Sequence, residues 1–406
     1  MLKKISFFAL AALLFVGCSS EEEKEKEKRN FKDSVYAFVN SHPDIVGYGK
    51  VDVNAVMDES NMEQNSLFQM FAAPTYEVIK SLVDVKAPVY IATATSENHS
   101  DLTMYMMFKL KNQKKMVEEL KEMGYEFKDH NGISYAEDED YVISARNETV
   151  IIIAAPGDYD GKSLVSQAFK YTEGKLAKGK MKKRLEAKGD FVMHMNLDGL
   201  KANDPSLRSL PDGTEVDFAL NFEEGKMIFE TNTNNFADIE QQMGMEMTDD
   251  PIISKKITDE EGNVIMAMQL SMESKLLNMM GIDAEEMSNT MNMMPLAMDG
   301  IEGSIELSDL TPTDNVVMPE TGKAMGGQYM EMMIDLDAVM AMQPEMNEYE
   351  EYWSKLDYAS MSINKDGTMR IVVTTDEEGQ NFLATVFEAV DAFMNNGGLM
   401  QIMAMQ

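Results

Sequence analysis

The sequence predicts an α+β fold with mainly antiparallel sheets and packed helices, built from two or three weakly repeated strand-helix-hairpin-helix units. Three observations predict it: short runs in which polar and apolar residues alternate, glycine turns that join pairs of such runs, and amphipathic stretches that end at a glycine. With 406 residues, 44% of them hydrophobic and 26% charged, the chain is long enough to bury the cores of two or three domains.

A strand that ends in a polar residue and turns directly into a helix is expected at three places. The alternating runs 48–52, 192–196 and 330–335 each end in a polar residue that can cap a helix, followed two positions later by a second polar residue in the first helical turn. We expect these residues at strand-to-helix junctions and assign them no chemistry. They are Asp52, Asn54, Asn196, Asp198, Asp335 and Asp337.

Hairpins and further helices complete the expected unit. Period-two alternation across a glycine turn predicts hairpins over 216–231 and 356–373, and a hairpin with a longer loop over 88–110. A three-strand meander is expected over 133–155. Apolar stripes predict helices at 114–123, 236–243, 276–280 and 376–393. The chain is accordingly divided into three α+β modules, 34–186, 187–320 and 321–406, after a leader (1–17) and a tether (18–33).

The first residues predict export and attachment to a membrane. Lys3 and Lys4 precede an apolar run over 5–16, which is too short for a permanent span and suits a secretory signal peptide. The run ends in the segment 14–18, Leu-Phe-Val-Gly-Cys, which contains the only cysteine of the chain. The charged run 21–29 cannot pack and is expected to be a solvated tether.

The segment 14–18 resembles a bacterial lipobox, in which a small residue precedes the cysteine that is acylated. The resemblance implies cleavage before Cys18, lipidation of Cys18 with diacylglycerol and a further acyl chain such as palmitate, and a protein anchored to a bilayer. Phe15 departs from the pattern, which prefers leucine there. The lipobox, the acidic start of the tether and the strand-helix pattern together are similar to a family of uncharacterised Bacteroidota outer-membrane lipoproteins with a domain of unknown function. That family implies an outer-membrane lipoprotein, surface-exposed or periplasm-facing, and no functional residues.

Composition excludes several partners and cofactors. The formal net charge of −34 argues against nucleic acid, because phosphates would be repelled. One cysteine excludes a disulfide framework and a cysteine-cage metal site. A glycine-rich segment, 155–163, lies between an expected strand and helix. Its glycines are too close for a phosphate-binding loop and its aspartates would repel phosphate, so we expect no nucleotide. Membrane contact through the lipid is the one partner predicted, and a protein or an apolar ligand is left open.

No catalytic, cofactor-binding or metal-ligating residue is assigned. The four histidines are far apart, and acidic clusters such as 137–140 are expected to be solvated turns. The 40 methionines are the compositional anomaly. Thioether sulfur binds Cu(I), but methionine also fills cores and lines adaptable binding surfaces. The favoured interpretation is a non-enzymatic binding or envelope-structural lipoprotein. A hydrolase with paired carboxylates and a methionine-rich copper-binding protein are the alternatives.

Overall fold

The computed structural model describes most of the chain from Arg29 onward. The described residues are 29–65, 68–69, 73–95, 102–157, 159–202, 204–244, 246–248, 250–273, 284–297, 305–311, 313–314, 316–319, 322–341, 354–376 and 379–393. The contacts of the chain divide it into two compact units, Met1–Ala219 and Leu220–Gln406. Cys18 lies outside the described residues. None of the described helices is long and apolar enough to cross a membrane.

Unit 1 is built on an antiparallel sheet in the order β8-β1-β2-β3-β7-β6-β5-β4. Its neighbours along the sequence pair where the connections are short, as expected for hairpins and a meander. The strands are β1 (Ile45–Val51), β2 (Val89–Thr95), β3 (Leu102–Lys109), β4 (Lys128–His130), β5 (Ile133–Glu137), β6 (Tyr141–Arg146), β7 (Thr149–Ala154) and β8 (Phe191–Asn196).

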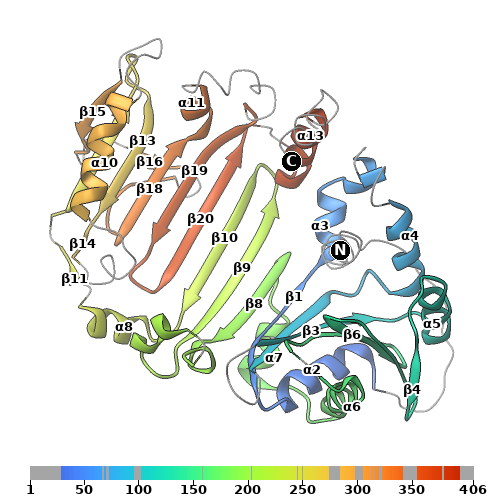
Figure 1. Cartoon of the computed structure of the whole chain (residues 1–406). Coiled ribbons are helices and arrows are strands. Elements are labelled where there is room, and N and C mark those ends of the chain that lie inside the picture. Colours follow the sequence, from blue (N-terminus) through green and yellow to red (C-terminus); the bar gives the residue numbers. More distant parts are fainter. Residues whose placement is uncertain are drawn as a thin grey trace. The chain divides into compact units, whose positions relative to one another are not determined.

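Helices lie on both faces of this sheet. Figure 1 shows α2, α6 and α7 on one side and α3, α4 and α5 on the other. The helices and 3-10 turns of unit 1 are α2 (Phe31–Ser41), α3 (Val53–Glu59), η1 (Met62–Gln64), α4 (Ala73–Leu82), α5 (Gln113–Glu122), α6 (Gly161–Thr172), α7 (Gly179–Leu185), η3 (Leu197–Leu200) and η4 (Pro205–Ser209).

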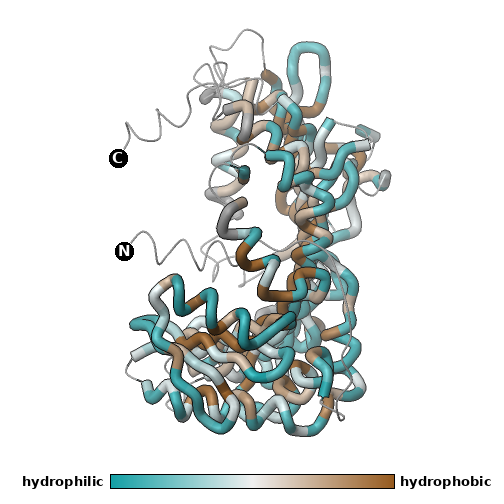
Figure 2. Tube along the Cα trace, turned by 90° about the vertical axis from the view of Figure 1, so that its right-hand side faces the viewer, coloured by the Kyte–Doolittle hydropathy of each residue, from teal (hydrophilic) through white to brown (hydrophobic). Residues whose placement is uncertain are grey.

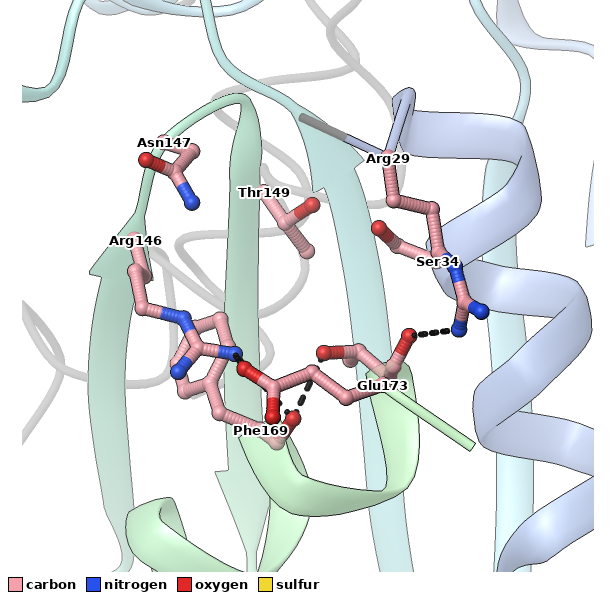
Figure 3. Close-up of a pocket in the computed structure, with 8 residues that line it drawn as sticks. Arg29, Ser34, Arg146, Asn147, Thr149, Phe169 and Glu173 are labelled. Atoms are coloured by element: carbon pink, nitrogen blue, oxygen red, sulfur yellow. Dashed lines mark hydrogen bonds and ion pairs between the residues drawn. The ribbon is translucent and has the colours of Figure 1, made fainter. Parts of the chain in front are cut away.

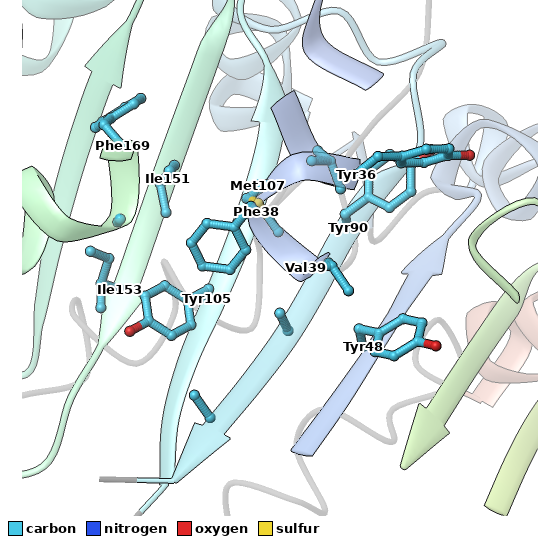
Figure 4. Packing of buried hydrophobic residues seen from close by; sticks show 14 of the residues in the cluster. Tyr36, Phe38, Val39, Tyr48, Tyr90, Tyr105, Met107, Ile151, Ile153 and Phe169 are labelled. Atoms are coloured by element: carbon cyan, nitrogen blue, oxygen red, sulfur yellow. The ribbon is translucent and has the colours of Figure 1, made fainter. Parts of the chain in front are cut away.

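The core of unit 1 lies between α2, α6 and the sheet. Phe38 of α2 is fully buried, and its ring contacts Tyr105 of β3 at a centroid distance of 5.0 Å (Figure 4). Ile151 and Ile153 of β7 are also fully buried in this cluster, together with Phe169 of α6. Apolar residues at alternating positions of these strands and on one stripe of α2 and α6 therefore meet in this core.

Unit 2 contains an antiparallel sheet in the order β15-β12-β13-β18-β19-β20-β10-β9 and two small two-stranded sheets. Strand β9 begins in unit 1 and ends in unit 2. The strands are β9 (Glu215–Glu223), β10 (Lys226–Thr233), β11 (Glu246–Met247), β12 (Ile253–Thr258), β13 (Val264–Leu270), β14 (Met272–Glu273), β15 (Glu306–Asp309), β16 (Val317–Met318), β17 (Lys323–Ala324), β18 (Met330–Asp335), β19 (Leu356–Ile363) and β20 (Thr368–Thr375).

Four described helices accompany this sheet: α8 (Phe236–Met243), α10 (Ala284–Ala297), α11 (Leu336–Ala341) and α13 (Phe382–Phe393). Helix α10 packs against β12 and β15, α11 against β19, and α13 against β10 and β20. Figure 2 shows brown, hydrophobic stretches interspersed with teal, hydrophilic ones along the trace of the described residues.

The α+β class with mainly antiparallel sheets is confirmed. The expected hairpins are β2-β3, β9-β10 and β19-β20, and the expected meander is β5-β6-β7. Helices α5 and α8 end next to Gly124 and Gly244, both with positive φ, as glycine caps require. The predicted start of the last helix, near residue 376, is wrong. Helix α13 begins at Phe382, after the cap Asn381. The expected helix 276–280 lies outside the described residues, and the three-module division stays a prediction.

Candidate functional site

The predicted junction residues lie where strands pass into helical turns. Asp52 follows β1 and caps α3 by accepting a hydrogen bond from the backbone of Ala55. Asn196 ends β8 and caps η3, and Asp335 ends β18 and accepts from the backbone of Ala338. Their second polar residues, Asn54, Asp198 and Asp337, lie in the helical turns that follow. These contacts are local caps, each made within its own strand-to-helix junction.

The glycine-rich segment leads into α6 through a capped helix start. The carboxylate of Asp160 accepts a hydrogen bond from the backbone of Lys162, and Gly161 lies against the side chain of Glu137. Carboxylates therefore occupy the helix N-terminus at which an anion would bind. Among the described residues no group of three or more histidine, cysteine, aspartate or glutamate side chains is arranged to hold a metal ion.

The methionines of the sheet strands are largely internal. Met266, Met268 and Met330 are buried in β13 and β18. Met-x-Met spacing, as at Met291 and Met293, would place two sulfurs on one face of a strand. They lie in helix α10, where Met291 is 4% exposed and Met293 is 61% exposed. Residues two apart in a helix point in different directions, so this pair does not form a two-sulfur site. Side chains at the other two such clusters, 243–247 and 403–405, lie outside the described part.

One polar cluster in unit 1 joins a histidine, an arginine and two carboxylates. His194 of β8 is 6% exposed, and its Nδ1 lies 2.9 Å from Oδ1 of Asp217. Its Nε2 lies 3.0 Å from Nη1 of Arg184, which is always a donor. His194 therefore accepts through Nε2 and donates to Asp217 through Nδ1. Because Arg184 occupies the nitrogen that a general base would use, the arrangement differs from a catalytic histidine-aspartate pair.

The two carboxylates of this cluster are held ionised. Burial raises the pKa of Glu215, but hydrogen bonds from Arg184 and Lys180 outweigh it and lower the pKa to about 2. Burial likewise raises the pKa of Asp217, and hydrogen bonds from His194 and Arg184 lower it below its ordinary value. Both carboxylates are on β9, two residues apart and on one face. A glycosidase pair needs one carboxyl with a raised pKa, so these two residues are an ion-pair cluster and not an acid-base dyad.

His42, just after α2, makes unit 1 sensitive to acid. Burial lowers the pKa of His42 to about 4, and its ring packs against Phe38, Tyr105 and Tyr171. Between pH 6.5 and 4 the unfolded chain binds a proton at this position that the folded chain does not bind. The contribution of His42 to the stability of the fold is therefore complete above pH 6.5, and it is lost as the pH falls towards 4.

We expect His42 alone to lower the free energy of unfolding by about 1–2 kcal/mol between pH 7 and pH 4. This is less than the free energy that corresponds to the whole pKa shift, because the ring is partly exposed. Urea unfolding at several pH values measures this loss. His42→Gln should reduce the pH dependence, whereas His130→Gln, which also removes one histidine, should leave it as in the parent. Equal pH dependence in the parent and in His42→Gln would contradict the assignment.

A cavity of about 210 Å³ lies at one end of the unit 1 core, between α2, α6 and the β6-β7 turn (Figure 3). Two guanidinium groups and several hydroxyl and amide groups face it. It is lined by Arg29, Ser34, Arg146, Asn147, Thr149, Phe169, Thr172 and Glu173. The chain has only five arginines, and two of them meet here.

Local structure explains how these side chains are presented. Asn147 adopts a positive φ of 56° in the tight turn between β6 and β7, a conformation that asparagine tolerates better than most residues. The turn places Arg146 and Thr149 on its two sides. Ser34 lies in the first turn of α2, after the cap Asn30. Arg29 donates from Nη1 to the carbonyls of Thr172 and Gly174, both at 2.8 Å, and so satisfies carbonyls at the C-terminal end of α6.

Arg146 is held by three contacts. Its Nη2 donates to the carbonyl of Phe169 at 3.1 Å and lies 2.7 Å from Oε1 of Glu173, and its guanidinium carbon lies 4.7 Å from the centre of the Phe169 ring. The side chain of Glu173 is 66% exposed, whereas that of Arg146 is 23% exposed. The cavity was not predicted from the sequence. The scarcity of arginine in an acidic chain was the one available signal, and it does not show which arginines meet.

Comparison with known proteins gives no family. No protein-family model matches the chain, and no curated protein matches it. Three structures of TP0453 are similar over about half of the chain. Crystal form IV has 10% identity, a TM-score of 0.33 and coverage of 51% of this chain and 84% of that one. Crystal form I has 12% identity, a TM-score of 0.31 and coverage of 52% of this chain and 86% of that one. Crystal form III has 11% identity, a TM-score of 0.33 and coverage of 52% of this chain and 87% of that one. Function therefore has to be inferred from the residues and the site.

Proposed function

We propose that this chain is a membrane-anchored, extracytoplasmic lipoprotein with a non-enzymatic role in binding or in the structure of the envelope. One observation carries the proposal: the only cysteine, Cys18, directly follows an apolar run with two lysines before it, in the pattern that resembles a lipobox. Two or more acyl chains on one residue give lasting attachment, whereas one gives marginal attachment. The localisation proposed is the outer membrane, facing either the surface or the periplasm.

A binding role, as opposed to catalysis, is supported by how the polar groups are used. In the cluster around His194 every charged group that could act as an acid or base is held by a partner of opposite charge or by Arg184. The cavity at Arg29 and Arg146 presents hydrogen-bond donors, which suit ligand recognition. A rigid body with donors around a small cavity can bind a ligand without a nucleophile or a base.

We also propose that the fold is composed of repeated units. At the end of β8 and of β18, and directly after β1, a side chain caps the helical turn that follows. The hairpins β2-β3, β9-β10 and β19-β20 follow these three junctions along the chain. The shared order of strand, helical turn and hairpin supports the repeat.

Lipidation is tested by labelling cells with palmitate and isolating the protein. We expect label on the parent and on Ser19→Ala, a matched change beside the cysteine, and no label on Cys18→Ala. On detergent phase separation the parent should enter the detergent phase, and Cys18→Ala the aqueous phase. An unlabelled parent, or a Cys18→Ala protein that stays with the membrane as the parent does, would refute the anchor. Protease treatment of intact cells then distinguishes the surface from the periplasmic face.

A further inference from the structure

We propose that the cavity between Arg29 and Arg146 is a binding site for the phosphate group of a ligand. This inference deepens the binding role proposed above and rests on it, but it does not depend on acylation of Cys18. Both arginine side chains line the cavity, and the carbonyls of Thr172 and Phe169 beside it already accept hydrogen bonds from them.

The first support is local charge. Arg29 and Arg146 contribute two positive charges to the lining, and Glu173 contributes its one negative charge. The chain as a whole has a net charge of −34, which would oppose an anion at long range. At physiological ionic strength charges are screened over about 8 Å, so the groups that line the cavity dominate what binds there.

The second support is the set of uncharged donors. Ser34 is 8% exposed and Thr149 is 5% exposed, and within the described part of the chain neither hydroxyl makes a hydrogen bond. A hydroxyl group that lines a cavity without a protein partner can donate a hydrogen bond to a ligand there. Asn147 adds an amide that has no partner within the same described residues. Figure 3 shows Thr149 and Ser34 between the two arginines, so that a group bound there would meet donors from both sides.

The third support is the direction of the donors. They come from the β6-β7 turn, from the first turn of α2 and from Arg29 before it, so they surround the ligand rather than lying in one plane. A tetrahedral phosphate can accept from all these directions, whereas a carboxylate has only two oxygens in one plane. Arginine is also suited to phosphate because its fork of N–H groups can bind two oxygens.

Glu173 competes with the ligand for Arg146. Its carboxylate is mostly exposed and is held by one ion pair, and exposed pairs contribute little to stability. An incoming phosphate can therefore displace Glu173 at low cost. Removal of the carboxylate of Glu173 should therefore tighten phosphate binding, because no hydrogen-bond donor of the cavity is lost.

The site also lies close to the membrane if the anchor is present. Cys18 and Arg29 are eleven residues apart, so the arginine is at most about 40 Å from the acylated residue. The phosphate can accordingly belong to a lipid headgroup or to a small soluble molecule. Both sources share the same recognition chemistry.

The test uses the full-length mature protein in detergent and isothermal titration with inorganic phosphate at constant ionic strength. We expect Arg146→Gln to weaken binding by about tenfold or more, because a charge-assisted hydrogen bond is lost. Glu173→Gln should tighten it by about threefold or more. Arg208→Gln, at an exposed arginine outside the cavity, should bind as the parent does. Acetate should bind at least about tenfold more weakly than phosphate.

Several results would overturn the site. They are no binding of phosphate to the parent, equal binding by Arg146→Gln and Arg208→Gln, equal affinity for acetate, or no tightening in Glu173→Gln. The last variant changes only an exposed side chain, so it tests the site even where Arg146→Gln fails to fold. Short-chain phosphatidylglycerol identifies the source: tighter binding than inorganic phosphate supports a headgroup, and equal or weaker binding supports a soluble phosphate. Cys18→Ala should bind phosphate normally, so this result is independent of the anchor.

Discussion

Phe38→Ala should lower the free energy of unfolding by about 3–5 kcal/mol, the range for removal of a fully buried aromatic side chain. Phe38 is 0% exposed and lies between helix α2 and strand β3. Its ring contacts Tyr105 at 5.0 Å, His42 at 5.5 Å and Tyr171 at 6.1 Å, measured between ring centres. The substitution removes these aromatic contacts and leaves a cavity that the surrounding strands cannot fill.

Urea unfolding followed by far-ultraviolet circular dichroism measures the change. Leu176→Ala is the control, because Leu176 is 37% exposed and its truncation removes less buried surface than that of Phe38. We expect it to lower the free energy of unfolding by about 1 kcal/mol or less. Phe38→Leu should fall between the two, since it keeps most of the apolar volume. A Phe38→Ala protein as stable as Leu176→Ala would show that α2 is not packed on the sheet as described.

The elements that sequence analysis predicted are those that local interactions determine. Alternation of apolar residues fixes the face of a strand, and a glycine with positive φ ends a helix whatever lies around it. Gly124 and Gly244 therefore marked helix ends correctly. Helix α13 was placed too early because its apolar stripe can be extended backwards along the sequence. The actual start depends on Asn381, whose side chain caps the helix and donates to the carbonyl of Phe222 in β9.

The candidate site was not predictable because it depends on contacts between distant residues. Arg29 contacts Thr172, which is 143 positions away, and these two residues meet only because α2 and α6 pack side by side. In the same way, nothing near His194 in the sequence indicates that Asp217 lies beside it. A single arginine or histidine in an alternating segment is compatible with exposure, with an ion pair or with a ligand. Only the order of the strands decides among these.

Arg184→Gln should lower the free energy of unfolding by about 2–4 kcal/mol, because it leaves two partly buried carboxylates and a buried histidine without their shared partner. The side chain of Arg184 is 13% exposed. Its Nη2 lies 2.8 Å from Oε2 of Glu215, and its Nε lies 2.9 Å from Oδ1 of Asp217. Arg208→Gln makes the same chemical change at an exposed position and should alter stability by less than about 0.5 kcal/mol.

The pH dependence separates loss of the ion pairs from a simple packing defect. The pKa of Glu215 in the folded chain is about 2, below its ordinary value of 4.5. The ion pair therefore stabilises the fold fully above pH 4.5, and this contribution disappears as the pH falls towards 2. The difference between Arg184→Gln and the parent should accordingly be largest near pH 7 and shrink at pH 3. A difference that stays constant over this range would assign Arg184 a packing role, because lost apolar contacts do not titrate.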